Sequence, residues 1–410
     1  MTRVLLIAPQ WIGDAVMAQP LVALLAARGE QVTALALPGI APVLRAMPGV
    51  VEVIEAPFAH GKLDLAARQR LATRLRAQDY ERAYILGNNL KSRLVPWLAR
   101  IPQRIGYRGE AHGLLLTHAM HAPRRAHACG ATRPDEALAA SSMADRSSRA
   151  TASSEPAKAG SARASRSDIR LHYAALAAWA RPGAAAAMMT SEENAGPMPS
   201  CLDSHGGWFG GPPPGRSDAA TNPAPTLEPR LHIAANMAAA TRQQFGLPGR
   251  WIALCPGAEF GPAKQWPVEH YAALARLAQQ QGYTVAVLGA PRDAAMGEAI
   301  ATQAATSVNL CGKTGVEQVI ALLASSQGTV SNDSGLMHVA AALGCATVGL
   351  YGSTDPRHTP PAAHRSAAIW LQLDCSPCFQ RTCPLGHLNC LRGITPEQAW
   401  ARLLGLMRAP

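Results

Sequence analysis

The stretch 331–344 has the composition of a helix start that can hold a phosphate group. Asp333 and Ser334 precede Gly335, and good helix formers follow up to a terminal glycine. Such a start leaves backbone N–H groups and the positive end of the helix dipole open to an anion, and His338 adds a donor one turn further on. The sequence therefore predicts a diphosphate site. The alternative is that Asp333 and Ser334 only cap the helix and that His338 only packs.

A second phosphate-type element is the loop 257–267, which follows an apolar run. It contains two glycines, and its Lys264 lies shortly before a helix start. An ammonium group at that place can dock an anionic ligand. The spacing is not that of a Walker loop, and Lys264 could equally be an ordinary solvated lysine.

Asp14 follows the first apolar run of the chain and opens a helical segment. A carboxylate that faces a cleft can accept the proton of a hydroxyl nucleophile, so Asp14 is a candidate general base. The plainer interpretation is an N-cap for the following helix. The two roles are compatible.

A cluster of cysteines occupies a loop near the C-terminus. The pair Cys375 and Cys378 has C-x₂-C spacing, and Cys383, His387 and Cys390 follow closely. This pattern indicates a structural zinc knot, although the second pair lacks the usual short spacing. Reduced or redox-active thiols are the alternative. In either case the cluster is expected to be structural, and no catalytic metal is expected.

Short apolar runs alternate with helical patterns in both halves of the chain, which is typical of parallel, doubly wound sheets. The fold class is therefore predicted as α/β, with two Rossmann-like sheets facing a cleft. In such sheets ligands bind beyond the carboxyl ends of the strands, where segments 11–14 and 87–91 would lie. The predicted strands are 4–8, 31–37, 50–54, 82–86, 251–255, 283–288, 307–310, 328–330 and 346–350, and the predicted helices include 14–28, 41–47, 63–78, 267–280 and 395–407.

A chain of 410 residues is too long for one compact core, so two domains are expected. We place an N-terminal domain at 1–183, a linker at 184–226 and a C-terminal domain at 227–410. The segments at about 126–167 and 184–226 consist largely of Ala, Ser, Gly and Pro, and both are predicted to be disordered insertions. Between them, 169–179 keeps a helical spacing and should dock on the first domain.

Lysine and arginine exceed aspartate and glutamate by 38 − 27 = 11, which indicates an acidic partner. Nucleic acid is not expected, because aromatic residues are only 5% and no zinc-finger or helix-turn-helix pattern occurs. The apolar runs are too interrupted for a membrane span, and the first lacks a cleavage-site pattern, so a cytoplasmic protein is expected.

Four motifs together carry a resemblance to a known family. They are 8–14, 255–264, 332–341 and 352–360, in this order and at both ends of the chain. The chain resembles the lipopolysaccharide heptosyltransferases of glycosyltransferase family nine, and the long string 256–264 favours the type II enzymes over type I.

This resemblance implies a GT-B fold and inverting transfer of L-glycero-D-manno-heptose from ADP-heptose to the first heptose of the inner core on lipid A. It implies neither a cofactor nor an obligatory metal. Asp14 would be the base and Lys264 would hold the donor phosphates. The residues that would surround the ADP-sugar are Asp333, Ser334, Gly335, Leu336 and His338.

The acceptor lies in an anionic leaflet, so the enzyme is expected to be peripheral at the inner membrane and to face it with basic side chains. The candidates for acceptor binding are Lys62, Lys91, Arg93, Arg100, Arg104 and Arg108. Three alternatives remain at this point: a type I or other family-nine enzyme, a sugar-nucleotide epimerase of the same fold, and a non-enzymatic phosphate- or membrane-binding module.

Overall fold

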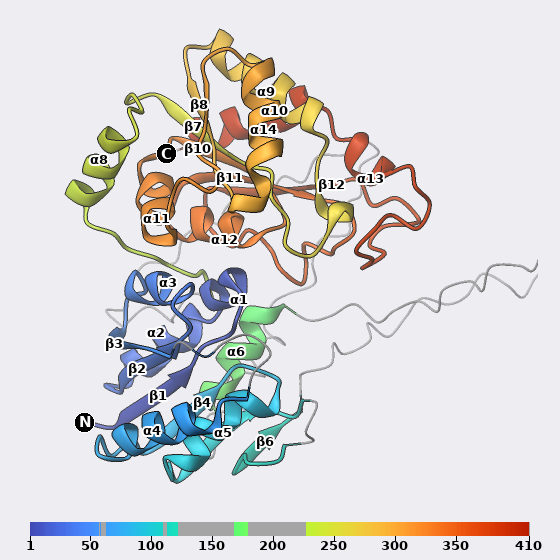
Figure 1. Ribbon diagram of the computed structural model, residues 1–410. Helices are drawn as coiled ribbons and strands as arrows, with labels where there is room; N and C mark the ends of the chain where they lie inside the picture. Colours follow the sequence, from blue (N-terminus) through green and yellow to red (C-terminus); the bar gives the residue numbers. More distant parts are fainter. Residues whose placement is uncertain (57, 59–62, 110–112, 122–167, 179–226, 410) are drawn as a thin grey trace, which may run out of the picture.

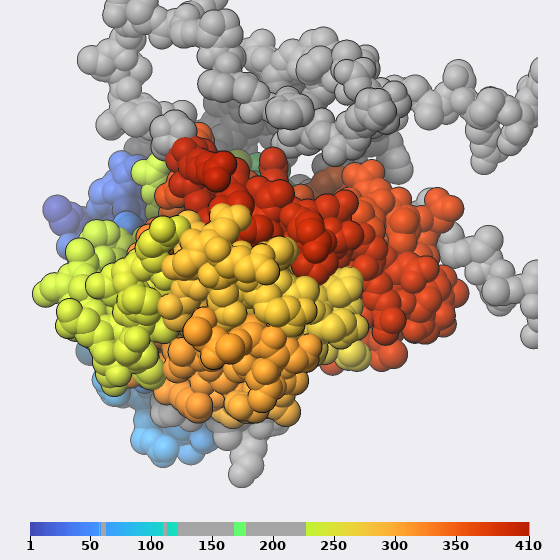
Figure 2. All heavy atoms as spheres, turned by 90° about the horizontal axis from the view of Figure 1, so that it is seen from above, coloured from blue at the N-terminus to red at the C-terminus, as the bar shows by residue number. Residues whose placement is uncertain are grey.

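The computed structural model describes residues 1–56, 58, 63–109, 113–121, 168–178 and 227–409. The predicted insertions at about 126–167 and 184–226, and Lys62, lie outside these residues. Two units, each built on one sheet, are stacked on one another (Figure 1). Seen from above, the C-terminal unit in yellow to red faces the viewer, and the blue residues of the N-terminal unit show at its margin (Figure 2).

The N-terminal unit has a six-stranded sheet in the order β3-β2-β1-β4-β5-β6, and all its strand pairs are parallel. Its elements are β1 (Arg3–Ile7), α1 (Ile12–Met17), α2 (Gln19–Ala27), β2 (Gln31–Ala36), α3 (Ala41–Arg45), β3 (Val50–Glu55), α4 (Leu65–Arg76), β4 (Arg82–Ile85), α5 (Leu90–Leu98), β5 (Gln103–Tyr107), β6 (His118–Met120) and α6 (Ile169–Ala178).

The C-terminal unit repeats this arrangement with the strand order β12-β11-β10-β7-β8-β9, again with parallel pairs. Its elements are α8 (Ala235–Gln244), β7 (Trp251–Cys255), η1 (Pro262–Lys264), α9 (Val268–Gln280), β8 (Thr284–Val287), η2 (Pro291–Asp293), α10 (Ala294–Gln303), β9 (Ser307–Asn309), α11 (Val316–Ser325), β10 (Gly328–Asn332), α12 (Gly335–Ala342), β11 (Ala346–Tyr351), β12 (Ser366–Trp370), α13 (Asn389–Arg392) and α14 (Pro396–Arg408).

The predicted α/β class and two doubly wound sheets are confirmed, and each predicted strand is present within two residues of its expected bounds. Strands β5, β6 and β12 were not predicted. Polar residues interrupt the sequences of β5 and β6, whereas residues 367–371 at β12 form a short apolar run that the sequence analysis did not use. The predicted helix at 14–28 is divided at Ala18 into α1 and α2, and Pro20 lies at the start of α2. The predicted helix at 169–179 is present as α6 and packs against α2 and α1.

Successive side chains of β1 point to opposite faces of the sheet and so belong to two different cores. Val4 and Leu6 pack with α1, α2 and α3, whereas Leu5 and Ile7 pack with α4 and α5 on the other face. The first of these cores continues into the C-terminal unit, where it includes Val339 of α12. The two units therefore share apolar contacts, which fix the facing edges of their sheets. None of the helices in the described ranges is long and apolar enough to span a membrane.

Candidate functional site

A large cleft lies at the point in each sheet where the strand order reverses, which is called the topological switch point. In the N-terminal sheet this switch point is between β1 and β4, and in the C-terminal sheet it is between β7 and β10. Consecutive connections leave such a point toward opposite faces of the sheet, which opens a crevice. Residues of both units line one cleft of about 2220 Å³. A site for one drug-sized ligand is roughly 300–1,000 Å³, so this cleft has room for two ligands.

Asp14 lies in the first turn of α1 and lines the cleft. The N-cap position belongs to Trp11, whose side chain makes no capping bond, so the prediction of Asp14 as an N-cap is wrong. Burial raises the pKa of Asp14 to about 6, although His358 and Lys264 nearby act to lower it. A carboxylate with this pKa is ionised at neutral pH and can still accept a proton.

The opposite wall holds an ion pair between Lys264 and Asp333. Lys264 Nζ lies 2.6 Å from Asp333 Oδ2, and Thr354 Oγ1 donates to the same oxygen at 2.6 Å. Burial would raise the pKa of Asp333, but Lys264 and His338 beside it hold the pKa below its ordinary value. Asp333 thus orients the ammonium group of Lys264, which is a different role from the predicted helix cap.

Asn332, at the end of β10, fixes the loop that carries Lys264. Its Oδ1 accepts hydrogen bonds from Trp266 N and from the Tyr271 hydroxyl, both at 3.0 Å, and its Nδ2 donates to the carbonyl of Pro256. Asn332, Trp266 and Tyr271 are buried. The loop 257–267 is therefore joined to the same strand end that carries Asp333, which places Lys264 with little freedom.

The start of α12 meets the start of α1 directly. A Cβ atom on Gly335 would lie 2.9 Å from Cβ of Ile12, and one on Gly13 would lie 2.9 Å from Cδ2 of His338. Contacts this short leave no room for a side chain. Asp14, which follows Gly13, therefore lies next to the start of α12, although the two helices belong to different units.

His338 is buried at this contact, and burial lowers its pKa to about 4. It is therefore neutral at pH 7. Its Nε2 lies 3.8 Å from Asp333 Oδ1, and its Nδ1 is buried with no hydrogen-bond partner among the described residues. The other predicted residues of this helix start, Ser334, Gly335 and Leu336, also line the cleft. The structure thus brings together every residue that was predicted to surround the donor.

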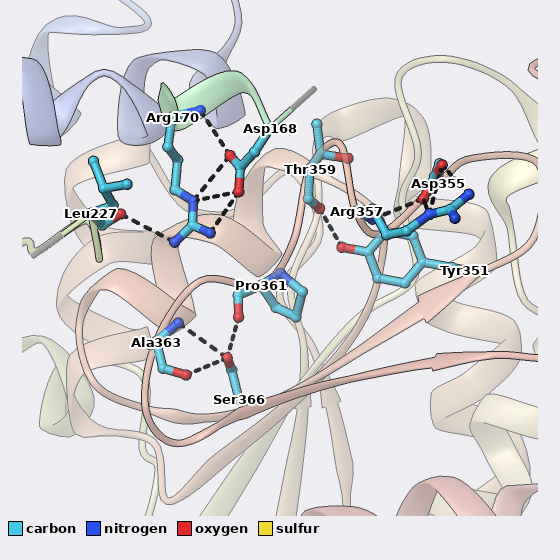
Figure 3. A network of polar contacts seen from close by, with 10 residues as sticks. All are labelled: Asp168, Arg170, Leu227, Tyr351, Asp355, Arg357, Thr359, Pro361, Ala363 and Ser366. Carbon is cyan, nitrogen blue, oxygen red and sulfur yellow. Dashed lines mark hydrogen bonds and ion pairs between the residues drawn. The ribbon is translucent and has the colours of Figure 1, made fainter. Parts of the chain in front are cut away.

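A loop after β11 adds His358 to the cleft. The Tyr351 hydroxyl donates to the Thr359 carbonyl at 2.6 Å, and Asp355 binds Arg357 at 2.8 Å (Figure 3). The loop also touches the N-terminal unit, because the His358 carbonyl accepts a bond from Ile169 N at 3.2 Å. Sequence reasoning did not assign His358 or Thr354 a role, although both lie in the motif 352–360.

The start of α6 is itself fixed where the two units meet. Arg170 is held by Asp168 at 2.6 Å and donates to the carbonyl of Leu227 at 3.1 Å (Figure 3). His172, one turn on, stacks edge-on against His358 with ring centroids 6.4 Å apart. The helix between the two predicted insertions thus forms part of the cleft wall.

Arg381 is a further cation at the cleft. Its guanidinium lies 5.3 Å from the ring centroid of Phe260, and Lys264 Nζ lies 5.4 Å from the same centroid. The Arg381 carbonyl accepts from Ala263 N at 3.0 Å, and Gly261, with φ of 149°, leaves the space for it. Within the described ranges Arg381 makes no ion pair, whereas Arg292 at the same cleft is paired with Glu259.

The prediction that arginines of the N-terminal unit bind the acceptor is in part wrong. Arg93 is fully buried, and its guanidinium donates to the carbonyls of Tyr107 at 3.1 Å and Leu114 at 3.4 Å. Arg104 likewise donates to backbone carbonyls, those of Leu115 at 2.8 Å and Ile101 at 2.5 Å. Arg93 is therefore closed off from any acceptor. Arg104 stabilises a loop but is partly exposed, so its binding of the acceptor stays a prediction.

Three of the predicted basic residues remain accessible. Arg100 and Arg108 are exposed, and Lys91 is half-buried in the first turn of α5. None of the three lines the cleft. Their binding of the acceptor therefore stays a prediction, and Lys62 lies outside the described residues.

The four clustered cysteines line one small cavity beside Ala263. All four thiols are free, and burial together with the neighbouring thiols raises the pKa of Cys390 to about 11. In the part of the chain that the structure describes, no three His, Cys, Asp or Glu side chains are grouped to hold a metal ion. The arrangement of these cysteines therefore gives no support to the possible zinc site, and the alternative of free thiols stays open.

Comparison with known proteins gives consistent matches over nearly the whole chain. The model of glycosyltransferase family 9 (heptosyltransferase) matches residues 68–167 and 217–389. Lipopolysaccharide heptosyltransferase 2 of Escherichia coli strain K12 is 32% identical over 99% of this chain and 98% of its own. Lipooligosaccharide heptosyltransferase 2 of Haemophilus influenzae is 30% identical over 99% of each chain.

A solved structure agrees with these sequence matches. The ADP-heptose LPS heptosyltransferase II of Escherichia coli superposes with a TM-score of 0.70 and 31% identity, over 99% of this chain and 98% of that one. The motifs that line the cleft thus occur within a fold shared along the full length of both chains.

Proposed function

This chain belongs to glycosyltransferase family 9, the heptosyltransferases, and we propose a role in transfer for each group in its cleft. Its two facing parallel sheets are the GT-B fold, and it is a heptosyltransferase of type II. It transfers heptose from ADP-heptose to a lipopolysaccharide acceptor. The alternatives of an epimerase or a non-enzymatic module receive no support, because the full-length relatives are named as heptosyltransferases.

The observation that supports this assignment of roles is the position of Asp14 opposite the group of Lys264, Asp333 and His338. One unit supplies a base and the other supplies an anion-binding wall, and the two helix starts touch. Because the acceptor hydroxyl is too weakly acidic to attack unaided, Asp14 accepts its proton as the oxygen bonds to C1 of the heptose. The bond from C1 to the ADP oxygen breaks on the opposite side, so the configuration at C1 inverts.

The leaving ADP gains negative charge as this bond breaks. Lys264, the N–H groups at the start of α12 and the guanidinium of Arg381 stabilise that charge. Asp333 offsets the charge of Lys264 and holds its position, so Arg381 supplies the cation that no carboxylate in the described residues neutralises. Nδ1 of His338 is available to hydrogen-bond the donor.

The acceptor that we propose is the first heptose of an inner core on lipid A, and the enzyme would act at the inner membrane surface. The decisive experiment is incubation with ADP-heptose and truncated lipopolysaccharides that carry either no heptose or one. We expect extension of the acceptor with one heptose only. Extension of the heptose-free acceptor would instead indicate type I specificity.

A further inference from the structure

Five large apolar side chains are exposed around helices α4 and α5 of the N-terminal unit. We call them the apolar rim: Leu63, Leu65, Leu90, Trp97 and Leu114, which are 38–60% exposed. Leu90, Leu94 and Trp97 follow one another at four and three residues along α5 and so share one face of that helix. An outward face of a helix is ordinarily polar. Helix α5 therefore exposes an apolar stripe to solvent.

Two buried arginines hold the parts of this rim together. Arg68 donates to the carbonyl of Leu63 at 2.7 Å and to that of Lys91 at 2.9 Å, which ties the segment before α4 to the start of α5. Arg93 joins α5 to the segment of Leu114 in the same way. Burial lowers the pKa of both guanidinium groups. Burying a cation costs free energy. In this fold the two buried guanidinium groups fix the segments that carry the apolar residues at the surface.

Helix α5, which carries part of the rim, begins shortly after a residue that lines the cleft, but the rim itself does not enter the cleft. Asn88, two residues before Leu90, lines the cleft together with Asp14, whereas none of the five rim residues does. In Figure 1, α4 and α5 lie at the bottom of the N-terminal unit, on the side away from the C-terminal unit. The rim is therefore left uncovered by the donor-binding half.

Charge around the rim is predominantly positive. Lys91 and the exposed Arg108 lie in the segments that carry Leu90 and Leu114, and the exposed Arg100 follows the end of α5. Asp64 is the acidic residue beside Leu63. Arg68 and Arg93 are buried beneath the rim and bind backbone carbonyls, so they are not available to headgroups. Exposed Leu and Trp with Lys and Arg around them are the composition of a surface that inserts shallowly into an anionic leaflet. A protein partner with an acidic, apolar face is a less direct match, because the acceptor is itself a lipid.

We infer that the apolar rim docks the enzyme on a phospholipid leaflet, so that the acceptor sugar reaches Asp14 while its acyl chains stay in the membrane. This inference rests on the proposed function, since it takes the acceptor to be membrane-embedded. The rim inserts its Leu and Trp side chains below the headgroups, and the surrounding cations bind anionic headgroups. No rim residue takes part in the chemical step.

The test is binding of the full chain to vesicles. The variant Leu90→Ser/Trp97→Ser/Leu114→Ser removes the rim, and Val51→Ser/Met237→Ser removes exposed apolar side chains from β3 and α8 as a matched control. Co-sedimentation uses vesicles of phosphatidylethanolamine with phosphatidylglycerol, and parallel vesicles without the anionic lipid. We expect the rim variant to lose at least about tenfold in partitioning and the control variant to bind like the unmodified protein. Melting temperatures confirm that both variants are folded.

Transfer assays separate this inference from the proposed function. With acceptor embedded in vesicles the rim variant should lose activity, whereas with a deacylated, water-soluble acceptor it should match the unmodified enzyme. Unchanged vesicle binding of the rim variant, or equal loss of activity on both acceptors, would overturn the inference. If the unmodified protein transfers to neither acceptor, the proposed function fails, and the vesicle measurement still decides whether the rim binds lipid.

Discussion

Gly13 of the N-terminal unit lies against His338 of the C-terminal unit so closely that a Cβ atom on Gly13 would be 2.9 Å from His338 Cδ2. We predict that Gly13→Ala separates the two helix starts by a fraction of an ångström to an ångström. Displacements of this size at a reacting centre cost about 10²-fold, so kcat/KM should fall by up to that factor. Steady-state kinetics with both substrates measures the effect.

The matched control is Gly405→Ala in α14, where a Cβ atom would meet no heavy atom within 4 Å. Helix propensity favours alanine over glycine by about 1 kcal/mol, so this variant should be as active and at least as stable as the unmodified enzyme. Equal activity of the two glycine variants would show that the close contact at Gly13 does not matter for catalysis.

Asp14→Asn preserves the shape of the side chain but cannot accept a proton. The turnover number should fall by about 10² or more, the typical contribution of a general base, while binding of ADP stays nearly unchanged. Single-turnover rates and calorimetric titration with ADP measure the two quantities. Near-normal turnover would remove Asp14 from the mechanism.

The raised pKa of Asp14 predicts a pH dependence in the measurable range. The base must be deprotonated in order to act, and its pKa is about 6 in the free enzyme. The value of kcat/KM should therefore be constant well above pH 6 and fall tenfold per unit as the pH drops below it. If Asp14 is the titrating group, the residual activity of Asp14→Asn should lack this acidic limb.

Lys264→Met should weaken donor binding by at least about tenfold, because a charge-assisted contact to the diphosphate is lost. It also leaves the buried carboxylate of Asp333 without its cation. In the unmodified protein the pKa of Asp333 lies below its ordinary value of 3.8, so the ion pair stabilises the fold above that pH. The variant should melt earlier at pH 7, and the difference should shrink as the pH falls below about 4.

Arg381→Gln tests whether this guanidinium, which makes no ion pair in the part of the chain that the structure describes, binds the donor. We expect the KM for ADP-heptose to rise about tenfold, as for loss of one charge-assisted hydrogen bond, and the KM for the acceptor to stay constant. Arg402→Gln replaces an exposed arginine of α14 outside the cleft and should change neither constant. A rise confined to the acceptor KM would assign Arg381 to an acceptor phosphate instead.

The sequence alone determined the class of fold and pointed to motifs that line the cleft. Short apolar runs alternating with helical periods require parallel sheets, because parallel strands need a crossover between them. The order and spacing of the motifs containing Asp14, Lys264 and Asp333 then place each one at the carboxyl end of a strand, and these are local properties of the chain. Strand β5 inside the first sheet and the edge strands β6 and β12 escaped prediction because their sequences are too short or too mixed for a period to show.

Only the tertiary structure decided which groups face one another. Contacts between residues far apart in the chain make Asp333 orient Lys264 and let Thr354 donate to Asp333. Such contacts also bring His358 into the cleft and place Arg381 and Lys264 at the same ring of Phe260. Burial depends on the same contacts. From the sequence Arg93 was predicted to be a surface cation. In the structure α5 packs so that the side chain is buried, and its guanidinium donates to backbone carbonyls. A sequence lists which side chains carry charge, whereas the fold sets the desolvation and neighbours that decide what each charge can bind.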